Sequence, residues 1–160
     1  FNPIGAHSSS LIGENPLDVP NNLVPLICEC AIGKRKKITI YGNDYSTIDG
    51  TCIRDYIHVS DLAEAHVLAL KNMFKYTDLK KIYNVGLSKG ISVLQLINLF
   101  EKNNNLKIHY DFGKRRDGDI EKIFADCSLI KKELNWGPKK TIAQALIDAW
   151  NWEKNKKNYK

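Results

Sequence analysis

The sequence contains two Tyr-x-x-x-Lys pairs, and such pairs can perform proton-transfer chemistry. They pair Tyr76 with Lys80 and Tyr110 with Lys114. On one face of a helix this spacing places an ammonium group beside a phenol, and the cation lowers the pKa of the phenol. Tyr76 falls at the end of an expected helix, however, and Tyr110 falls in an expected strand, where a spacing of four has no such meaning. We therefore predict that neither pair is catalytic.

Two arginines have the chemistry needed to bind a diphosphate. The guanidinium groups of Arg54 and Arg116 can donate paired hydrogen bonds to phosphate oxygens. A helix beginning after Asn22 would add backbone N–H groups and a favourable dipole, and Asp119 could accept hydrogen bonds from ribose hydroxyls. Residue types alone leave another interpretation open, in which Arg54 pairs with Asp55 and the other arginines are solvated.

Several common catalytic and cofactor motifs do not occur in the sequence. It has no G-x-G-x-x-G run, so the phosphate-binding turn of a dinucleotide site is missing. The four histidines and four cysteines do not follow metal-ligand spacings, and we expect no metal site. We expect free, mostly buried thiols in a reducing cytoplasm at Cys28, Cys30, Cys52 and Cys127.

Composition and charge indicate one soluble globular domain. The chain has 160 residues, of which 43% are hydrophobic and 26% charged, and its net charge is +6. No apolar run approaches the roughly 18 residues of a membrane span, no signal peptide is visible, and a start at Phe1 suggests a segment from within a longer protein. The basic residues form separate clusters and are not interleaved with aromatic residues, which favours a small anionic ligand over nucleic acid or a membrane.

Hydrophobic periodicity and capping residues predict an alternation of strands and amphipathic helices, which is typical of the α/β class. Helices are expected at 23–32, from Asp61 as N-cap to about 74, at 92–103, from Asp126 or Ser128 to near 136, and from Thr141 onward. Strands are expected at 37–41, 54–59, 81–85 and 107–112. The segments 81–85, 92–103 and 107–112 would form a right-handed βαβ unit. Four short strands make an incomplete sheet, so we expect the apolar helix faces at 93–100 and 142–150 to be left uncovered.

Five segments of the sequence resemble UDP-glucose 4-epimerases, which are members of the extended short-chain dehydrogenase/reductase family. They are FNPIGAH at 1–7, PNNLVP at 20–25, YGNDYSTIDGTCIRDYIHVSDL at 41–62, YNVG at 83–86 and RRDGD at 115–119. The third segment is the most specific, because related nucleotide-sugar enzymes share only a looser version of it. The resemblance extends over essentially all 160 residues.

The resemblance implies an α/β fold: the C-terminal, substrate-binding part of an extended Rossmann-type fold with an incomplete sheet. Residues 1–160 would be the UDP-sugar-binding portion, and the N-terminal NAD-binding domain with the catalytic residues would be absent from this chain. The intact protein would be a cytoplasmic, NAD-dependent homodimer that interconverts UDP-glucose and UDP-galactose, whereas this chain alone would be inactive. The alternative is a catalytically inactive, truncated module that binds a nucleotide or a partner.

The resemblance also implies roles for individual residues. Asn2 would contact the diphosphate or the sugar, Asn22 and Leu23 the phosphates, Thr39, Ile40 and Tyr41 the uracil, Arg54 the diphosphate, and Arg116 and Asp119 the diphosphate and ribose. Phe1 would contact the nicotinamide of NAD through its backbone. Ile123 occupies a position that is Tyr in many of these epimerases and small in those that accept N-acetyl sugars. The size of the side chain at this position would set how much room the sugar pocket has. Ile123 is intermediate in size between Tyr and a small residue.

Overall fold

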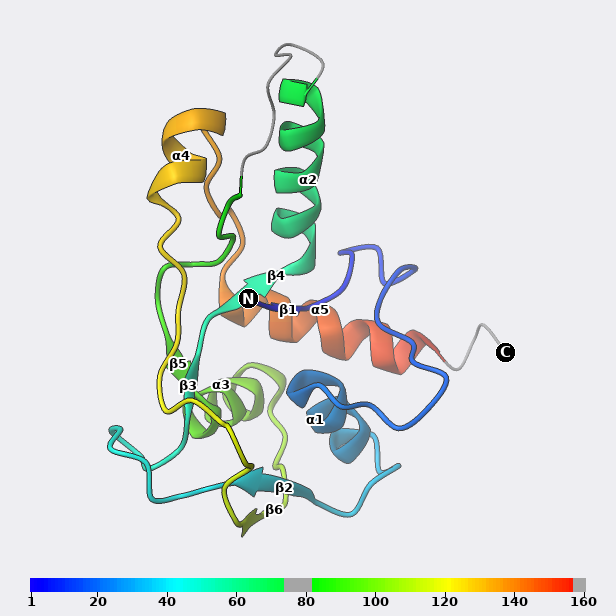
Figure 1. The fold of residues 1–160 in the computed structure, drawn as a ribbon. Helices are drawn as coiled ribbons and strands as arrows, with labels where there is room; N and C mark the ends of the chain where they lie inside the picture. Colours follow the sequence, from blue (N-terminus) through cyan, green and yellow to red (C-terminus); the bar gives the residue numbers. More distant parts are fainter. Residues whose placement is uncertain (74–81, 157–160) are drawn as a thin grey trace.

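The computed structural model describes residues 1–73 and 82–156, and it has a mixed α/β architecture. The helices are α1 (Leu23–Ala31), α2 (Val59–Met73), α3 (Val93–Asn104), α4 (Ser128–Leu134) and α5 (Ile142–Asn155). The strands are β1 (Asn2–Ile4), β2 (Ile38–Tyr41), β3 (Ile53–Arg54), β4 (Tyr56–His58), β5 (Ile91–Ser92) and β6 (Tyr110–Gly113). In Figure 1, α5 crosses the middle of the molecule, with α2 and α4 at one end and α1, α3, β2 and β6 at the other.

The described strands form three two-stranded sheets and no continuous sheet. β1 pairs with β4 and β2 pairs with β6, both in parallel, whereas β3 and β5 are antiparallel. The expected incomplete sheet is therefore present. The two parallel pairs join segments that lie far apart in the sequence, because Asn2 is in register with Tyr56 and Ile38 with Tyr110.

The prediction of a βαβ unit from segments 81–85, 92–103 and 107–112 is wrong. Residues 82–85 of the expected strand 81–85 have no strand geometry, and Lys81 lies outside the described residues. The segment is held by irregular contacts instead: Tyr83 donates a hydrogen bond to Glu133, and Gly86 N–H lies 3.2 Å from the Cys127 sulfur. The expected strand 107–112 begins later, at Tyr110, and pairs with β2.

The capping predictions were correct at two helices and wrong at a third. Ser92 and Gln95 form a capping box on α3, and the Thr141 hydroxyl accepts from the Gln144 N–H at the start of α5. Asp61 is not an N-cap, because α2 begins two residues earlier, at Val59. Its buried carboxylate accepts hydrogen bonds from backbone N–H groups that precede α5, at distances of 2.9 and 3.1 Å.

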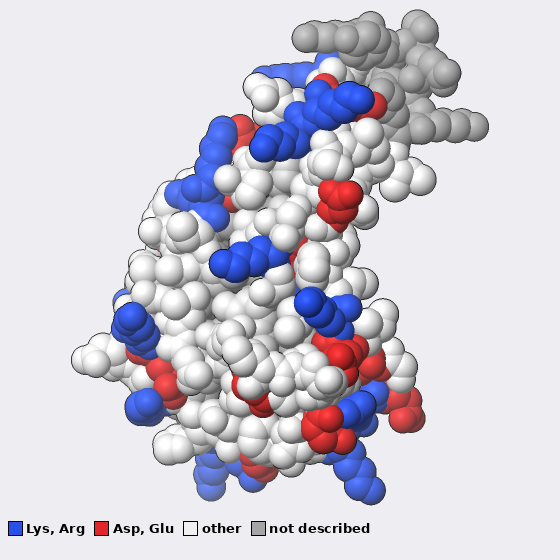
Figure 2. Space-filling model, turned by 90° about the vertical axis from the view of Figure 1, so that its left-hand side faces the viewer, with Lys and Arg blue, Asp and Glu red and all other residues white. Residues whose placement is uncertain are grey.

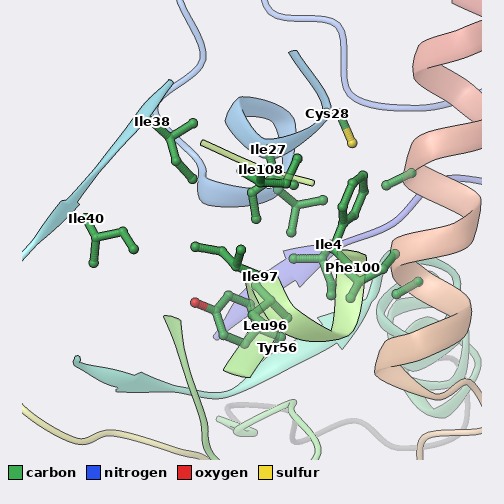
Figure 3. Close-up of a cluster of buried hydrophobic side chains, with 14 residues drawn as sticks. Ile4, Ile27, Cys28, Ile38, Ile40, Tyr56, Leu96, Ile97, Phe100 and Ile108 are labelled. Atoms are coloured by element: carbon green, nitrogen blue, oxygen red, sulfur yellow. The ribbon is translucent and has the colours of Figure 1, made fainter. Parts of the chain in front are cut away.

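The main hydrophobic core lies between α1, α3 and α5, next to β1, β2 and β4 (Figure 3). Leu96, Ile97 and Phe100 of α3 meet Ala145 and Leu146 of α5, and all five are fully buried. The prediction that these two helix faces lack cover is therefore wrong, because each face covers the other. A second, smaller core joins α2 and α4 around Trp136.

Apolar surface is nevertheless exposed elsewhere on the chain. Val67, Leu70 and Met73 of α2 are each about half exposed.

Candidate functional site

A cavity of about 350 Å³ lies where β1, β2, β3 and the start of α1 meet. Every site residue predicted from the sequence lines it except Ile123: Phe1, Asn2, Asn22, Leu23, Thr39, Ile40, Tyr41, Arg54, Arg116 and Asp119. These residues come from five separated segments. The cavity is within the size range of small-molecule sites in proteins.

Arg54 and Asp119 form an ion pair in the wall of the cavity. Arg54 Nη2 lies 2.5 Å from Asp119 Oδ1, and Arg54 Nη1 donates to the Ile53 carbonyl at 2.8 Å. Both side chains are largely enclosed, with exposed fractions of 14% and 23%. The guanidinium therefore has a fixed direction and a partner, while other N–H groups remain to bind an anion.

The alternative pairing of Arg54 with its neighbour Asp55 does not occur. The Asp55 carboxylate is fully buried and accepts backbone N–H groups from Leu87, Ser88 and Ala125, at 2.7 to 3.1 Å. Asp55 thus ties two remote loops to the strand segment that carries Arg54. Its bonds stabilise the backbone next to Arg54.

Two consecutive arginines stack on two tyrosines. The Arg116 guanidinium carbon lies 4.1 Å from the centre of the Tyr41 ring, and Arg115 lies at the same distance over the Tyr45 ring. Arg115 also donates to Asp44 at 2.7 Å, and this bond holds the pKa of the Asp44 carboxyl below its ordinary value. Arg116 lines the cavity and Arg115 does not. The stacking leaves the edge of Arg116 available for hydrogen bonds.

The N-terminus of α1 faces the cavity. Asn22 occupies the N-cap position with extended backbone angles, yet its side chain makes no cap hydrogen bond and donates to Glu14 instead. Asn22, Leu23 and Val24 all line the cavity. The positive end of the helix dipole therefore points to the same space as the two guanidinium groups.

Some lining residues were not predicted from the sequence, among them Cys52, Tyr56 and Val93. Cys52 and Tyr56 alternate with Arg54 along extended backbone, so the three side chains share one face. This period of two was a signal that could have found them. Burial raises the pKa of both the Cys52 thiol and the Tyr56 phenol, which keeps these groups neutral.

Ile123 lies outside the cavity lining. Its side chain is 40% exposed, and its backbone N–H donates to the Ile53 carbonyl at 3.1 Å, beside Arg54. Of the two Tyr-x-x-x-Lys pairs, Tyr110 lies in strand β6, and Tyr76 and Lys80 lie outside the described residues. The strand position of Tyr110 agrees with the expectation that its spacing to Lys114 has no helical meaning.

Charged side chains of both signs are mixed on the face of the molecule shown in Figure 2. Lysine and arginine side chains lie there among aspartate and glutamate side chains, and no continuous patch of positive side chains covers the face. Within residues 1–73 and 82–156, no group of three or more His, Cys, Asp or Glu side chains could hold a metal ion. None of the described helices has the length and apolar character needed to cross a membrane.

The fold is of the α/β class, and the cavity brings two guanidinium groups and the N-terminus of a helix to one space. Residues 1–148 match the GDP-mannose 4,6 dehydratase family, so the chain belongs to this family. Among curated relatives, it is 48% identical over 155 residues to UDP-glucose 4-epimerase of Haemophilus influenzae, covering 97% of this chain and 46% of that protein. It is 47% identical over 152 residues to UDP-glucose 4-epimerase 4 of Oryza sativa subsp. japonica, covering 95% of this chain and 41% of that protein.

Solved structures of UDP-glucose 4-epimerases share the fold. The Stenotrophomonas maltophila enzyme with bound NAD and formylated UDP-arabinopyranose superposes with a TM-score of 0.95 at 42% identity, covering 100% of this chain and 47% of that one. The Bifidobacterium longum enzyme in complex with NAD+ and UDP gives 0.90 at 42% identity, covering 99% and 47%. The chain thus spans less than half the length of these relatives.

Proposed function

We propose that this chain is the C-terminal, UDP-sugar-binding portion of a UDP-glucose 4-epimerase, and that UDP occupies the cavity. The observation that carries the proposal is the convergence of Arg54, Arg116 and the N-terminus of α1 on one space. Each of the three favours negative charge, and together they match a diphosphate. The similarity to epimerases over almost the whole chain supports uridine as the nucleoside.

The residues have separate tasks in this proposal. Arg54 and Arg116 neutralise the diphosphate, and the backbone N–H groups at the start of α1 bind its oxygens. Asp119 accepts hydrogen bonds from the ribose hydroxyls. The β2 segment Thr39–Tyr41 offers backbone donors and acceptors to the uracil edge. Firm binding of UDP leaves the sugar free to turn over, which an epimerase at C4 requires.

NAD would be held mainly by residues outside this chain. Phe1 fits a contact with it, because Phe1 lines the cavity and is 43% exposed immediately before β1. When bound, NAD supplies hydride acceptance and return at sugar C4. The residues of this chain contribute binding and orientation of the substrate. The proposal includes a cytoplasmic homodimer that acts in galactose metabolism, with the NAD-binding domain preceding residue 1.

The test uses the full-length protein that contains this chain. It should convert UDP-galactose to UDP-glucose in a coupled assay, and UDP should bind competitively with substrate in calorimetry. ADP is the matched control, since it has the same diphosphate but a different base, and it should bind more weakly. Tight UDP binding without turnover would instead favour a non-catalytic nucleotide-binding module. Failure to bind UDP would overturn the proposal.

A further inference from the structure

Asn22 occupies the N-cap position of α1, but its side chain is bonded elsewhere. The amide nitrogen Nδ2 donates to Glu14 Oε1 at 2.9 Å, and the side chain makes no hydrogen bond to the backbone of the helix. Asn22 lines the cavity, whereas Glu14 lies outside its lining. A residue outside the cavity is therefore bonded to a side chain of the cavity wall.

This bond leaves backbone N–H groups of α1 available to a ligand. An N-cap side chain usually accepts from the second or third N–H group of its helix. In α1 the third residue is Pro25, which has no N–H, so a cap could bond only to Val24. Because the Asn22 side chain is bonded to Glu14, the N–H groups of Leu23 and Val24 have no acceptor within the helix and can bind an anion.

The Glu14 carboxylate also sets the direction of the Asn22 amide. A carboxylate only accepts hydrogen bonds, so the NH2 end of the amide, and not its carbonyl oxygen, lies against Glu14. An amide NH2 group has two N–H bonds, and the second one remains for an acceptor in the cavity. Asn22 is thus held as a donor, which is the group that a phosphate oxygen requires.

The backbone of Glu14 is attached to α5. Trp152 Nε1 donates to the Glu14 carbonyl oxygen at 2.9 Å. A Cβ atom at Gly13 would clash with the Trp152 ring, so glycine at this position allows the indole to approach the loop. In Figure 1 the loop between β1 and α1 runs beside α5. This attachment keeps the exposed Glu14 side chain within reach of Asn22.

We propose that Glu14 is a positioning residue for the diphosphate: it holds the Asn22 amide as a hydrogen-bond donor and keeps it from capping α1. Glu14 acts through Asn22, because its own negative charge would repel an anionic ligand. The benefit to binding therefore comes from the hydrogen bond and not from the charge. This inference rests on the proposed UDP site and adds to it a residue from outside the cavity.

The first experiment is Glu14→Ala in the full-length protein, with UDP affinity measured by calorimetry. The variant should bind UDP about 3- to 10-fold more weakly, because one hydrogen bond that orients Asn22 is lost. Glu14→Gln keeps a side-chain oxygen that can accept from Asn22, so its affinity should be close to that of the wild type. Asp18→Ala removes an exposed carboxyl group from the same loop, outside the cavity lining, and should change nothing.

Three results of this experiment would overturn the inference. Unchanged UDP affinity in Glu14→Ala would show that the bond to Asn22 has no effect on binding. Tighter binding would show that repulsion by the carboxylate is the larger effect. Equal losses in Glu14→Ala and Glu14→Gln would show that the charge acts, and not the acceptor. If the wild-type protein does not bind UDP, the proposed function itself fails, which is a different outcome.

Kinetics separate positioning of the diphosphate from a structural role of Glu14. The diphosphate is bound both before and during the reaction at the sugar, so Glu14→Ala should raise KM about 3- to 10-fold and leave kcat unchanged. If Glu14 only stabilises the loop, Glu14→Ala would lower the melting temperature without ligand while KM stays the same. That result would contradict the inference.

The second experiment tests whether Glu14 acts through Asn22. In an Asn22→Ala background the carboxylate has no amide to hold, so adding Glu14→Ala should weaken UDP binding no further. Equal losses in both backgrounds would show that Glu14 acts independently of Asn22, contrary to the inference.

Discussion

The imidazole of His58 and the carboxylate of Asp148 are hydrogen-bonded at 3.2 Å, and both side chains are buried. Ser60 N–H donates to His58 Nδ1, so Nε2 carries the proton and donates to Asp148. The second oxygen of Asp148 accepts from the Gln144 amide at 2.9 Å. This hydrogen-bonded pair holds α5 against β4. The preceding strand, β3, ends at Arg54.

Replacing Asp148 by Ala should destabilise the protein. The change leaves the buried His58 Nε2–H and the half-buried Gln144 amide without their acceptor, which costs about 2–3 kcal/mol of the free energy of unfolding. Urea unfolding of the full-length protein measures this loss. Asp148→Asn keeps one carbonyl acceptor and should lose less. An unchanged unfolding midpoint for Asp148→Ala would show that the pair contributes nothing to stability.

Arg54→Ala should weaken UDP binding strongly. Removing an enclosed, hydrogen-bonded charge at a binding site costs about 2–5 kcal/mol of binding free energy. Arg35→Ala is the matched control: it deletes the same group from a partly enclosed ion pair with Glu29, outside the cavity lining. Calorimetry with UDP compares the two variants. Similar small losses would show that Arg54 has only a structural role.

Glu101 should contribute stability that disappears in acid. Burial acts to raise its pKa, but hydrogen bonds from Ile108 N–H at 2.8 Å and Lys107 at 3.0 Å hold it below the ordinary 4.5. A lowered folded-state pKa means that this stability is present above about pH 4.5 and is lost as the pH falls through the folded value. Glu101→Gln should lower stability at pH 7 by about 1–2 kcal/mol and flatten the decline below pH 5.

The measurement for Glu101 is a series of urea unfolding curves between pH 7 and pH 3. Asp117→Asn, which removes an exposed carboxyl group, is the control and should leave the curves close to those of the wild type. If Glu101→Gln lowers stability equally at every pH, the carboxylate bonds are not the source of the acid dependence.

Substitutions at Ile123 should change sugar preference without a large loss of stability. If Ile123 limits the space beside the sugar, Ile123→Tyr penalises N-acetyl sugars and Ile123→Ala favours them, by about 10- to 200-fold. Its 40% exposure means that neither change removes a core side chain. The kcat/KM ratio for UDP-galactose and UDP-N-acetylgalactosamine in the full-length enzyme measures the preference. If this ratio is the same for the Ile, Tyr and Ala proteins, Ile123 does not line the sugar pocket.

The sequence by itself predicted the helices and many of the residues that line the cavity. Apolar spacing and the caps at Ser92 and Thr141 predicted α3 and α5, because helix formation depends on residues within one or two turns. All the site residues that the resemblance to epimerases named, except Ile123, line the cavity, since such a resemblance records residue types at particular positions. These signals are local or motif-based and need no knowledge of distant contacts.

The tertiary structure decided which distant groups are partners. Residues 82–85 have a strand-like sequence but found no neighbouring strand, and a strand is stable only when its backbone is paired. Asp61 fits a helix cap, yet its carboxylate binds N–H groups 78 and 79 residues later. The pairing of Arg54 with Asp119 is equally non-local. Hydrogen bonds and ion pairs form across space, so their partners follow from the folded arrangement and not from the order of residues along the chain.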